Sequence, residues 1–262
     1  MKISQIISIL EDFAPLPLQD GFDNSGLQIG DTSRTLTGVL LCLDVTEEVI
    51  DEALELECNL IISHHPLLFK PLKSITGRNY IERCVIKACK HDLVVYAAHT
   101  NLDNVSGGVS FRIAEKIGLQ NIRILSPKNE NDWESAGSGV VGELLSPEDE
   151  SSFLLRLKQI FQLDVLKHSP LRNTEIREVA ICGGSGAFLI PEAINYGADI
   201  FITGEAKYND YYDVEKQILL AVIGHYESEI CTKELFFDII TKKIPNFALH
   251  FSTVNSNPVK YI

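Results

Sequence analysis

Residues 60–66 read Leu60-Ile61-Ile62-Ser63-His64-His65-Pro66, a short apolar run followed at once by two histidines. A β-branched run of this length predicts a buried strand, so both imidazoles should emerge where the strand leaves its sheet. In α/β proteins ligands bind at that edge. Successive strand residues point to opposite faces, so both rings reach one ion only if the chain turns into the loop that Pro66 ends. The pair therefore indicates two metal ions, or one ligand and one bystander.

The segments around this strand alternate between strands and helices. We expect a strand at residues 39–43 and an amphipathic helix at 46–56 with Thr46 as its N-cap, which together with the histidine strand makes a β-α-β unit. A helix at 81–90 and a strand at 93–98 extend the pattern. That strand runs into His99-Thr100-Asn101-Leu102-Asp103. A histidine and a carboxylate thus follow a second strand.

Part of this pattern returns 140 residues later. Without gaps, the shift superimposes several identical residues, among them Val39 on Val179, Cys42 on Cys182 and Ile62 on Ile202. The second copy is expected as a strand at 179–182, a helix at 189–195 and a strand at 200–203. It has Gly204 and Glu205 in place of His64 and His65.

A second correspondence appears when the shift is reduced to 126. His99 and Asp103 then fall on His225 and Glu229, and each pair comes just after an apolar strand. From this repeat we predict an α/β protein of two similar lobes that arose by internal duplication, with mixed sheets flanked by helices. The first lobe would span residues 1–125 and carry His64, His65 and Asp103. The second would span residues 126–262, with a metal site at the junction.

The residues at these strand ends are of the types that bind divalent metals. They are His64, His65, His99, Asp103, His225 and Glu229. Imidazoles and carboxylates suit Zn, Fe, Mn, Ni or Co, and carboxylates can bridge two ions. In a helix, a histidine and an acid four residues apart share one face. Two metals activate water at neutral pH, so the pattern predicts hydrolysis. Alternatively these residues only solvate the sheet edge, although four of the seven histidines fall in these clusters.

Glycine-rich stretches form a second group of candidates. Gly183-Gly184-Ser185-Gly186 follows an expected strand, so its N–H groups could hold an anion, or the loop could be only a tight turn. Residues 137–142 match G-x-G-x-x-G, but no apolar strand precedes them, which favours a bend in a strand. Residues 128–132 should form a polar loop. Near the first strand, Asp23 or Asn24 could line a site.

Composition limits the function further. The net charge of −13 and the pI of about 5.0 argue against non-specific nucleic-acid binding. Six cysteines without a C-x-x-C pair suit reduced thiols, so we expect a cytoplasmic protein. Residues 1–13 have the periodicity of an amphipathic helix and not of a secretory signal. No apolar run approaches the ~20 residues that span a bilayer.

The motifs together resemble one known family. They are Asp23-Asn24-Ser25-Gly26-Leu27-Gln28-Ile29-Gly30, Ser63-His64-His65-Pro66-Leu67, His99-Thr100-Asn101-Leu102-Asp103, Gly183-Gly184-Ser185-Gly186 and Gly224-His225-Tyr226-Glu227-Ser228-Glu229. In this order they resemble the signatures of the Nif-three-like family, known also as type-two GTP cyclohydrolase I homologues. The resemblance implies two α/β lobes, a toroidal homohexamer and a dinuclear metal centre. It implies His64, His65, Asp103, His225 and Glu229 as ligands, with Asp103 bridging and His99 close by.

Two features depart from that family. Some members carry a domain inserted between the lobes, for which the stretch between Asp103 and Gly183 is too short. Members often have a histidine just after Thr-Gly-Glu, where this chain has Lys207, Tyr208 and Asn209.

The leading hypothesis is a metal-dependent hydrolase that acts on a small molecule, such as a nucleotide or a cyclic amide. Two divalent ions per chain would activate water, and His99 or Glu205 would carry the proton. One alternative is a metal-storing or metal-delivering protein without turnover. Another is an interaction scaffold.

Overall fold

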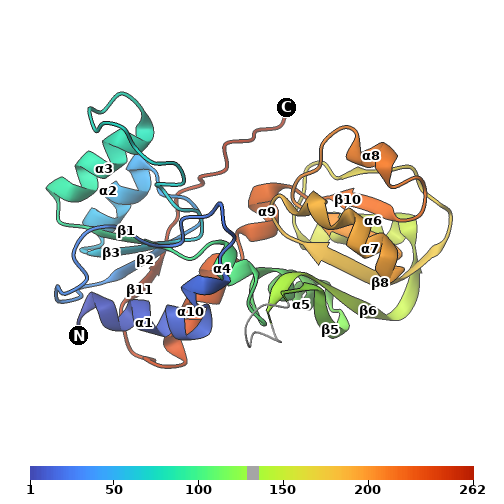
Figure 1. Cartoon of the computed structure of the whole chain (residues 1–262), viewed down its shortest axis with the longest axis horizontal. Helices are drawn as coiled ribbons and strands as arrows, with labels where there is room; N and C mark the ends of the chain where they lie inside the picture. Colours follow the sequence, from blue (N-terminus) through green and yellow to red (C-terminus); the bar gives the residue numbers. More distant parts are fainter. Residues whose placement is uncertain (129–135) are drawn as a thin grey trace. The chain divides into compact units, whose positions relative to one another are not determined.

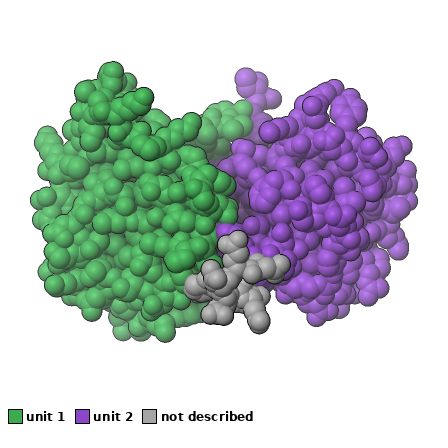
Figure 2. Space-filling model, viewed as in Figure 1, with its two compact units in different colours: residues 1–102, 232–260 green, residues 103–231, 261–262 purple. Residues whose placement is uncertain are grey.

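The structure is a computed structural model that describes residues 1–128 and 136–262. It divides into two compact units, coloured separately in Figure 2. Unit 1 comprises Met1–Leu102 and Thr232–Lys260, and unit 2 comprises Asp103–Cys231 and Tyr261–Ile262. The polar loop expected at 128–132 lies, from residue 129 onward, outside the described residues.

Unit 1 is built on a five-stranded mixed sheet (Figure 1). Its strands are β1 (Gly26–Ile29), β2 (Val39–Cys42), β3 (Leu60–Ser63), β4 (Val94–Ala97) and β11 (Leu249–Phe251). The order is β1-β4-β3-β2-β11, and only β1 pairs antiparallel. All residues of β2, β3 and β4 are buried, which explains why they read as continuous apolar runs.

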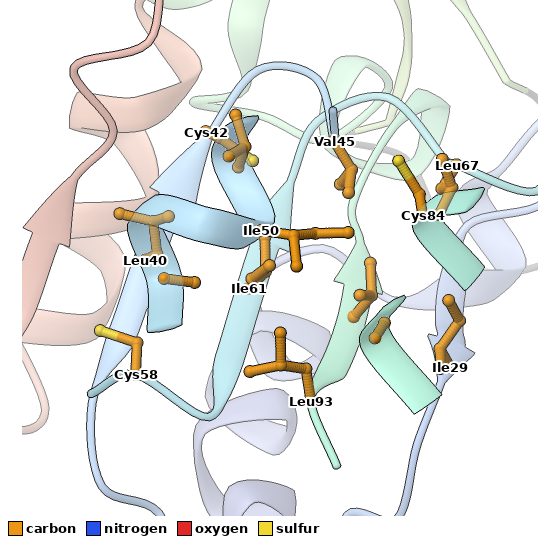
Figure 3. Close-up of a cluster of buried hydrophobic side chains, with 14 of the residues drawn as sticks. Ile29, Leu40, Cys42, Val45, Ile50, Cys58, Ile61, Leu67, Cys84 and Leu93 are labelled. Carbon is orange, nitrogen blue, oxygen red and sulfur yellow. The ribbon is translucent and has the colours of Figure 1, made fainter. Parts of the chain in front are cut away.

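Four longer helices cover this sheet. They are α1 (Ile3–Phe13), α2 (Glu47–Glu55), α3 (Tyr80–Lys90) and α10 (Thr232–Thr241), and a short turn, η1 (Leu16–Leu18), follows α1. Figure 3 shows one side of the core, where Ile50 of α2 and Cys84 of α3 pack with Leu40 and Ile61 of the sheet. The expected N-cap is confirmed, because Thr46 Oγ1 accepts a hydrogen bond from the N–H of Val49 at 3.3 Å.

Unit 2 contains a six-stranded mixed sheet in the order β5-β6-β8-β9-β10-β7. The strands are β5 (Gln120–Pro127), β6 (Gly137–Asp149), β7 (Lys167–His168), β8 (Glu175–Cys182), β9 (Ile200–Thr203) and β10 (Leu219–Val222). Only β8, β9 and β10 run parallel to one another. Residues 137–142 lie within β6, and Gly139 has a φ of +66°, so the predicted bend in a strand is confirmed.

The remaining elements are helices and helical turns. They are α4 (Thr100–Asp103), α5 (Val109–Ile117), α6 (Glu150–Ile160), η2 (Gly186–Leu189), α7 (Ile190–Tyr196), α8 (Asp210–Asp213) and α9 (His225–Glu229). Helices α5 and α6 pack on β6 and β8, and α7 contributes to the unit 2 core. The predicted α/β class with two mixed sheets flanked by helices is confirmed.

The two units divide the chain differently from the expected boundary between residues 125 and 126. β11 pairs with β2, and α10 packs against α1, so the C-terminal part of the chain belongs to unit 1. Conversely, β5 pairs with β6, which assigns the stretch from Asp103 onward to unit 2. Strand pairing decides both assignments, and β11 pairs with a strand that lies far from it in the sequence.

The two parallel strand pairs that suggested a repeat share one register. Val39 of β2 lies opposite Leu60 of β3, and Val179 of β8 lies opposite Ile200 of β9. Both pairings correspond at the same shift of 140 residues. An origin by internal duplication stays a prediction.

Within the described residues, no helix has the length and apolar character needed to cross a membrane.

Candidate metal centre

The histidine pair lies directly beyond β3, and neighbouring strand ends hold both rings. His64 is fully buried, and its Nδ1 lies 2.9 Å from the carbonyl oxygen of Ala98, just beyond β4. His65 Nδ1 lies 2.7 Å from Oδ1 of Asp44, just beyond β2. Because Nδ1 of each ring is taken up by these contacts, Nε2 is the nitrogen that would bind a metal ion.

His99 follows β4 and is held by Asp23. Its Nδ1 lies 2.7 Å from Oδ1 of Asp23, whose side chain is 0% exposed. The other oxygen, Oδ2, accepts hydrogen bonds from the N–H and hydroxyl of Thr100 and from the hydroxyl of Ser25. Burial opposes ionisation of Asp23, but the hydrogen bonds from His99, Thr100 and Ser25 outweigh it and hold its pKa well below the usual range. Asp23 is therefore an anion that fixes the His99 ring.

These three rings, which we call the histidine cluster, converge on one place in unit 1. One ring nitrogen each from His64, His65 and His99 lies within 4.8 Å of the others. The ring centroids are 5.1 Å apart for His64 and His65 and for His64 and His99, and 5.5 Å apart for His65 and His99. The turn after β3 thus aims both adjacent rings at one site. Three imidazoles with Nδ1 held by an acid or carbonyl are a donor set that could hold a divalent ion.

Unit 2 carries a separate pair on α9, which we call the His–Glu pair. His225 and Glu229 are four residues apart, and Nε2 of His225 lies 2.9 Å from Oε2 of Glu229. Glu229 is 4% exposed, and on its other side the His225 ring meets Glu205, with Nδ1 3.1 Å from Oε1. The predicted helical arrangement of this histidine and acid on one face is confirmed.

The glycine loop packs against α9. The N–H of Gly184 donates to Oγ of Ser228 at 3.0 Å, and the N–H of Gly186 donates to Oγ1 of Thr203 at 3.1 Å. A Cβ atom at Gly184, where φ is +57°, would collide with Oε1 of Glu229. Of the two interpretations of this loop, anion site or tight turn, the tight turn is favoured. The N–H groups of Gly184 and Gly186 already donate within the fold, and the missing Cβ of Gly184 leaves room for the carboxylate of Glu229.

Asp103 is the last residue of α4 and is half-buried. It belongs to no group of three or more potential ligand atoms within 4.8 Å of one another in residues 1–128 and 136–262. Its role as a bridging ligand stays a prediction.

Comparison with known proteins assigns the chain to a family. A model described as Duf34/NIF3 (NGG1p interacting factor 3) matches residues 1–258. The chain belongs to the Duf34/NIF3 family. A Clostridium perfringens relative named GTP cyclohydrolase 1 type 2 homolog is 40% identical over 232 residues, which cover 87% of each chain. The crystal structure of Staphylococcus aureus protein SA1388 superimposes with a TM-score of 0.91 at 30% identity, covering 100% of this chain and 99% of that one.

A second solved Duf34/NIF3 structure has the same fold. A Bacillus cereus protein related to NIF3 has a TM-score of 0.91 at 25% identity, covering 100% of this chain and 99% of that one. The resemblance derived from the motifs is thereby confirmed.

Sequence reasoning missed one part of this Duf34/NIF3 site, the acids that hold the histidines. Asp44 was not singled out, although it follows the apolar run 39–43 as His64 follows its own strand. Asp23 was considered beside Asn24, but its pairing with His99 joins residues 76 positions apart. Position at a strand end is the signal that could have identified Asp44.

Proposed function

We propose that this protein binds two divalent metal ions and uses them to hydrolyse a small molecule such as a nucleotide or a cyclic amide. The residues that would hold the ions in this proposal are His64, His65, Asp103, His225 and Glu229, and the carboxylate of Asp103 could bridge them. The metal is one of Zn, Fe, Mn, Ni or Co.

The observation that carries the proposal is the way the imidazoles are held. His65 Nδ1 is 2.7 Å from Asp44, His99 Nδ1 is 2.7 Å from Asp23, and His64 Nδ1 is 2.9 Å from a backbone carbonyl. Metal-binding histidines almost always engage their second nitrogen in this manner, which fixes the tautomer and raises the basicity of the ligand atom. Three such rings within one cluster support a metal-binding role over simple solvation of a sheet edge.

The proposed chemistry divides between the ions and the chain. A bound divalent ion supplies Lewis acidity toward a carbonyl or phosphoryl oxygen and makes water acidic enough to react near neutral pH. His99 is the proton carrier in this proposal, because ionised Asp23 keeps a proton on Nδ1 and leaves Nε2 as the basic nitrogen.

Glu205 has a different role in the proposal. The sequence offers it as a second proton carrier, and it is 58% exposed. Its Oε1 lies against Nδ1 of His225, and its Oε2 accepts a hydrogen bond from Ser185 at 2.8 Å. This position supports an electrostatic role for Glu205 beside His225, on the opposite side of the ring from Glu229.

The proposal is tested by metal analysis combined with an activity panel. Wild-type protein should hold close to two metal ions per chain and hydrolyse at least one member of a panel of nucleotides, phosphoesters and cyclic amides. His65→Ala should lose metal and activity together. His91→Ala, which alters an exposed histidine at the end of α3, is the matched control and should behave as wild type.

Two results would count against the proposal in different ways. Less than one metal ion per chain after growth in metal-rich medium, with no affinity in titration, would refute metal binding altogether. Tightly held, exchangeable metal without hydrolysis of any panel member would refute catalysis and would indicate a metal-storing or metal-delivering protein.

The proposal extends to assembly and setting. The family resemblance supports a toroidal homohexamer, which sedimentation or light scattering of the purified protein would test. A reducing, cytoplasmic setting is supported by the six cysteines, none of which forms a disulfide in the described part of the chain.

A further inference from the structure

Unit 2 contains a pocket whose lining residues include none of the proposed metal ligands. It lies beyond the end of β9 and has a volume of about 590 Å³. Its wall includes Lys167, Ser185, Phe188, Glu205, Lys207 and Asp210. Small-molecule sites have volumes of roughly 300–1,000 Å³, so the pocket has the size of a metabolite site.

The pocket adjoins the His–Glu pair through Glu205. One oxygen of this carboxylate lies 3.1 Å from Nδ1 of His225, and the same side chain forms part of the pocket wall. Ser185, which donates to the other oxygen at 2.8 Å, also lines the pocket. A molecule bound here would therefore contact the carboxylate that lies beside His225.

The pocket wall offers two ammonium groups to an anionic ligand, beside two carboxylates. Both of its acids already have partners, because Glu205 meets Ser185 and His225, and Asp210 accepts a 2.6 Å hydrogen bond from the N–H of Lys207. Lys167 and Lys207 are exposed, and neither ammonium group makes an ion pair within the described ranges. Both ammonium groups are therefore available to a bound ligand. Lysine ammonium groups are common binders of phosphate.

The pocket also offers a flat apolar surface. Phe188 belongs to η2, and 62% of its surface is exposed, which is unusual for a large aromatic side chain unless it covers or binds something. An exposed ring can stack on a heterocycle, a contact that depends little on which base is bound. The combination of two ammonium groups and one exposed ring matches a phosphorylated heterocycle.

We propose that this pocket is the substrate-anchoring subsite, in which Lys167 and Lys207 bind a phosphate group and Phe188 stacks on a heterocyclic ring. The inference rests on the proposed hydrolase function, because it selects a phosphorylated, nucleotide-like substrate over a neutral cyclic amide. The three residues determine specificity, and the reaction itself takes place at the adjoining metal-binding residues.

Calorimetric titration of the full-length, metal-loaded protein tests this assignment with three probes: guanosine monophosphate, guanosine and inorganic phosphate. The monophosphate should bind roughly tenfold more tightly than guanosine, because charge-assisted contacts to phosphate are strong, and added salt should weaken it. Lys167→Ala and Lys207→Ala should each weaken the monophosphate several-fold and leave guanosine unchanged. Phe188→Ala should weaken both guanosine and the monophosphate by roughly fivefold or more and leave inorganic phosphate unchanged.

Lys90→Ala, an exposed lysine at the end of α3 in unit 1, is the matched control and should bind all probes as wild type does. Equal affinity for guanosine and its monophosphate, wild-type affinity in both lysine variants, or no binding of any probe would overturn the subsite.

These outcomes are separable from failure of the proposed function. Metal binding and cleavage of a neutral substrate, without lysine-dependent nucleotide binding, would reject the subsite alone. Lysine-dependent binding in a protein that holds no metal would reject the hydrolase and retain the pocket.

Discussion

Replacement of Asp44 tests whether the histidine cluster binds metal. Asp44 Oδ1 lies 2.7 Å from Nδ1 of His65, so Asp44→Asn removes the negative charge that orients this ring but keeps the size of the side chain. Loss of such a partner of a metal-binding histidine lowers metal affinity about 10- to 100-fold. This range corresponds to about 1.4–2.7 kcal/mol of binding free energy. The same change should leave the buried strands of unit 1 intact.

A graded variant and a control sharpen this prediction. Oδ2 of Asp44 accepts a 2.6 Å hydrogen bond from Ser256, in the segment that follows β11. Ser256→Ala removes one hydrogen bond to this carboxylate but leaves its charge and its contact with His65, so it should lower metal affinity less, roughly fivefold. Asp51→Asn serves as the control, because the Asp51 side chain is 54% exposed and pairs with Lys87 at 2.6 Å. Its metal affinity should equal that of wild type.

Competition with a chromophoric chelator at pH 7.5 measures the affinity, and circular dichroism verifies that each variant is folded. The expected order of affinity is wild type and Asp51→Asn, then Ser256→Ala, then Asp44→Asn. If folded Asp44→Asn binds metal within about threefold of wild type, below the smallest effect expected on loss of such a partner, the reasoning that His65 is a ligand held by Asp44 fails.

Three further predictions concern stability. Glu150 is 3% exposed and pairs with Arg172 at 3.3 Å, so Glu150→Ala should lower the free energy of unfolding in urea by about 3–5 kcal/mol, and a loss below about 1 kcal/mol would contradict this. Gly204→Ala would place a Cβ atom 2.7 Å from the carbonyl oxygen of Gly184, so we expect a loss of about 1–3 kcal/mol; an unchanged melting temperature would be inconsistent with this packing. Hydrogen bonds from residues 76 and 78 lower the pKa of Glu82 from 4.5 to about 2, so its carboxylate stabilises the fold above pH 4.5 and this contribution is lost as the pH falls toward 2. Glu82→Gln should therefore be less stable than wild type at pH 7, and the difference should shrink at pH 3; a gap that does not narrow would show that the carboxylate is not responsible.

Local patterns in the sequence were sufficient to predict the central strands. The run Leu60-Ile61-Ile62 is buried on both faces of a parallel strand, so it contains no polar alternation that could obscure it. The helix N-cap was also predictable, because the Thr46 hydroxyl accepts its hydrogen bond from a backbone N–H only three residues away in the sequence. The division into units was not predictable in this way. β11 has three residues, and its pairing with β2 spans most of the chain.

For the candidate site, the sequence was sufficient to predict the histidines but not the acids that contact them. Histidines are rare, with seven in the chain, so several at strand ends form a visible signal. Acids number 36, and even where an acid follows an apolar run, as Asp44 does, matching it to His65, or Asp23 to His99, requires knowledge of which strands are neighbours. The sequence therefore indicates which side chains would bind an ion, but not which side chains orient them.

The two units solve the same orientation problem from different backbone positions. In unit 1 an acid beyond β2, Asp44, holds His65, which follows β3. At the shift of 140 residues, Asp44 corresponds to Gly184 and His65 corresponds to Glu205. Position 184 accommodates no Cβ, because Glu229 occupies the space, and the acid beside Nδ1 of His225 is Glu205, which follows β9 as His65 follows β3. An acid therefore cannot stand at position 184 as Asp44 stands in unit 1, and the packing of Glu229 against the glycine loop is the physical reason for this difference between the units.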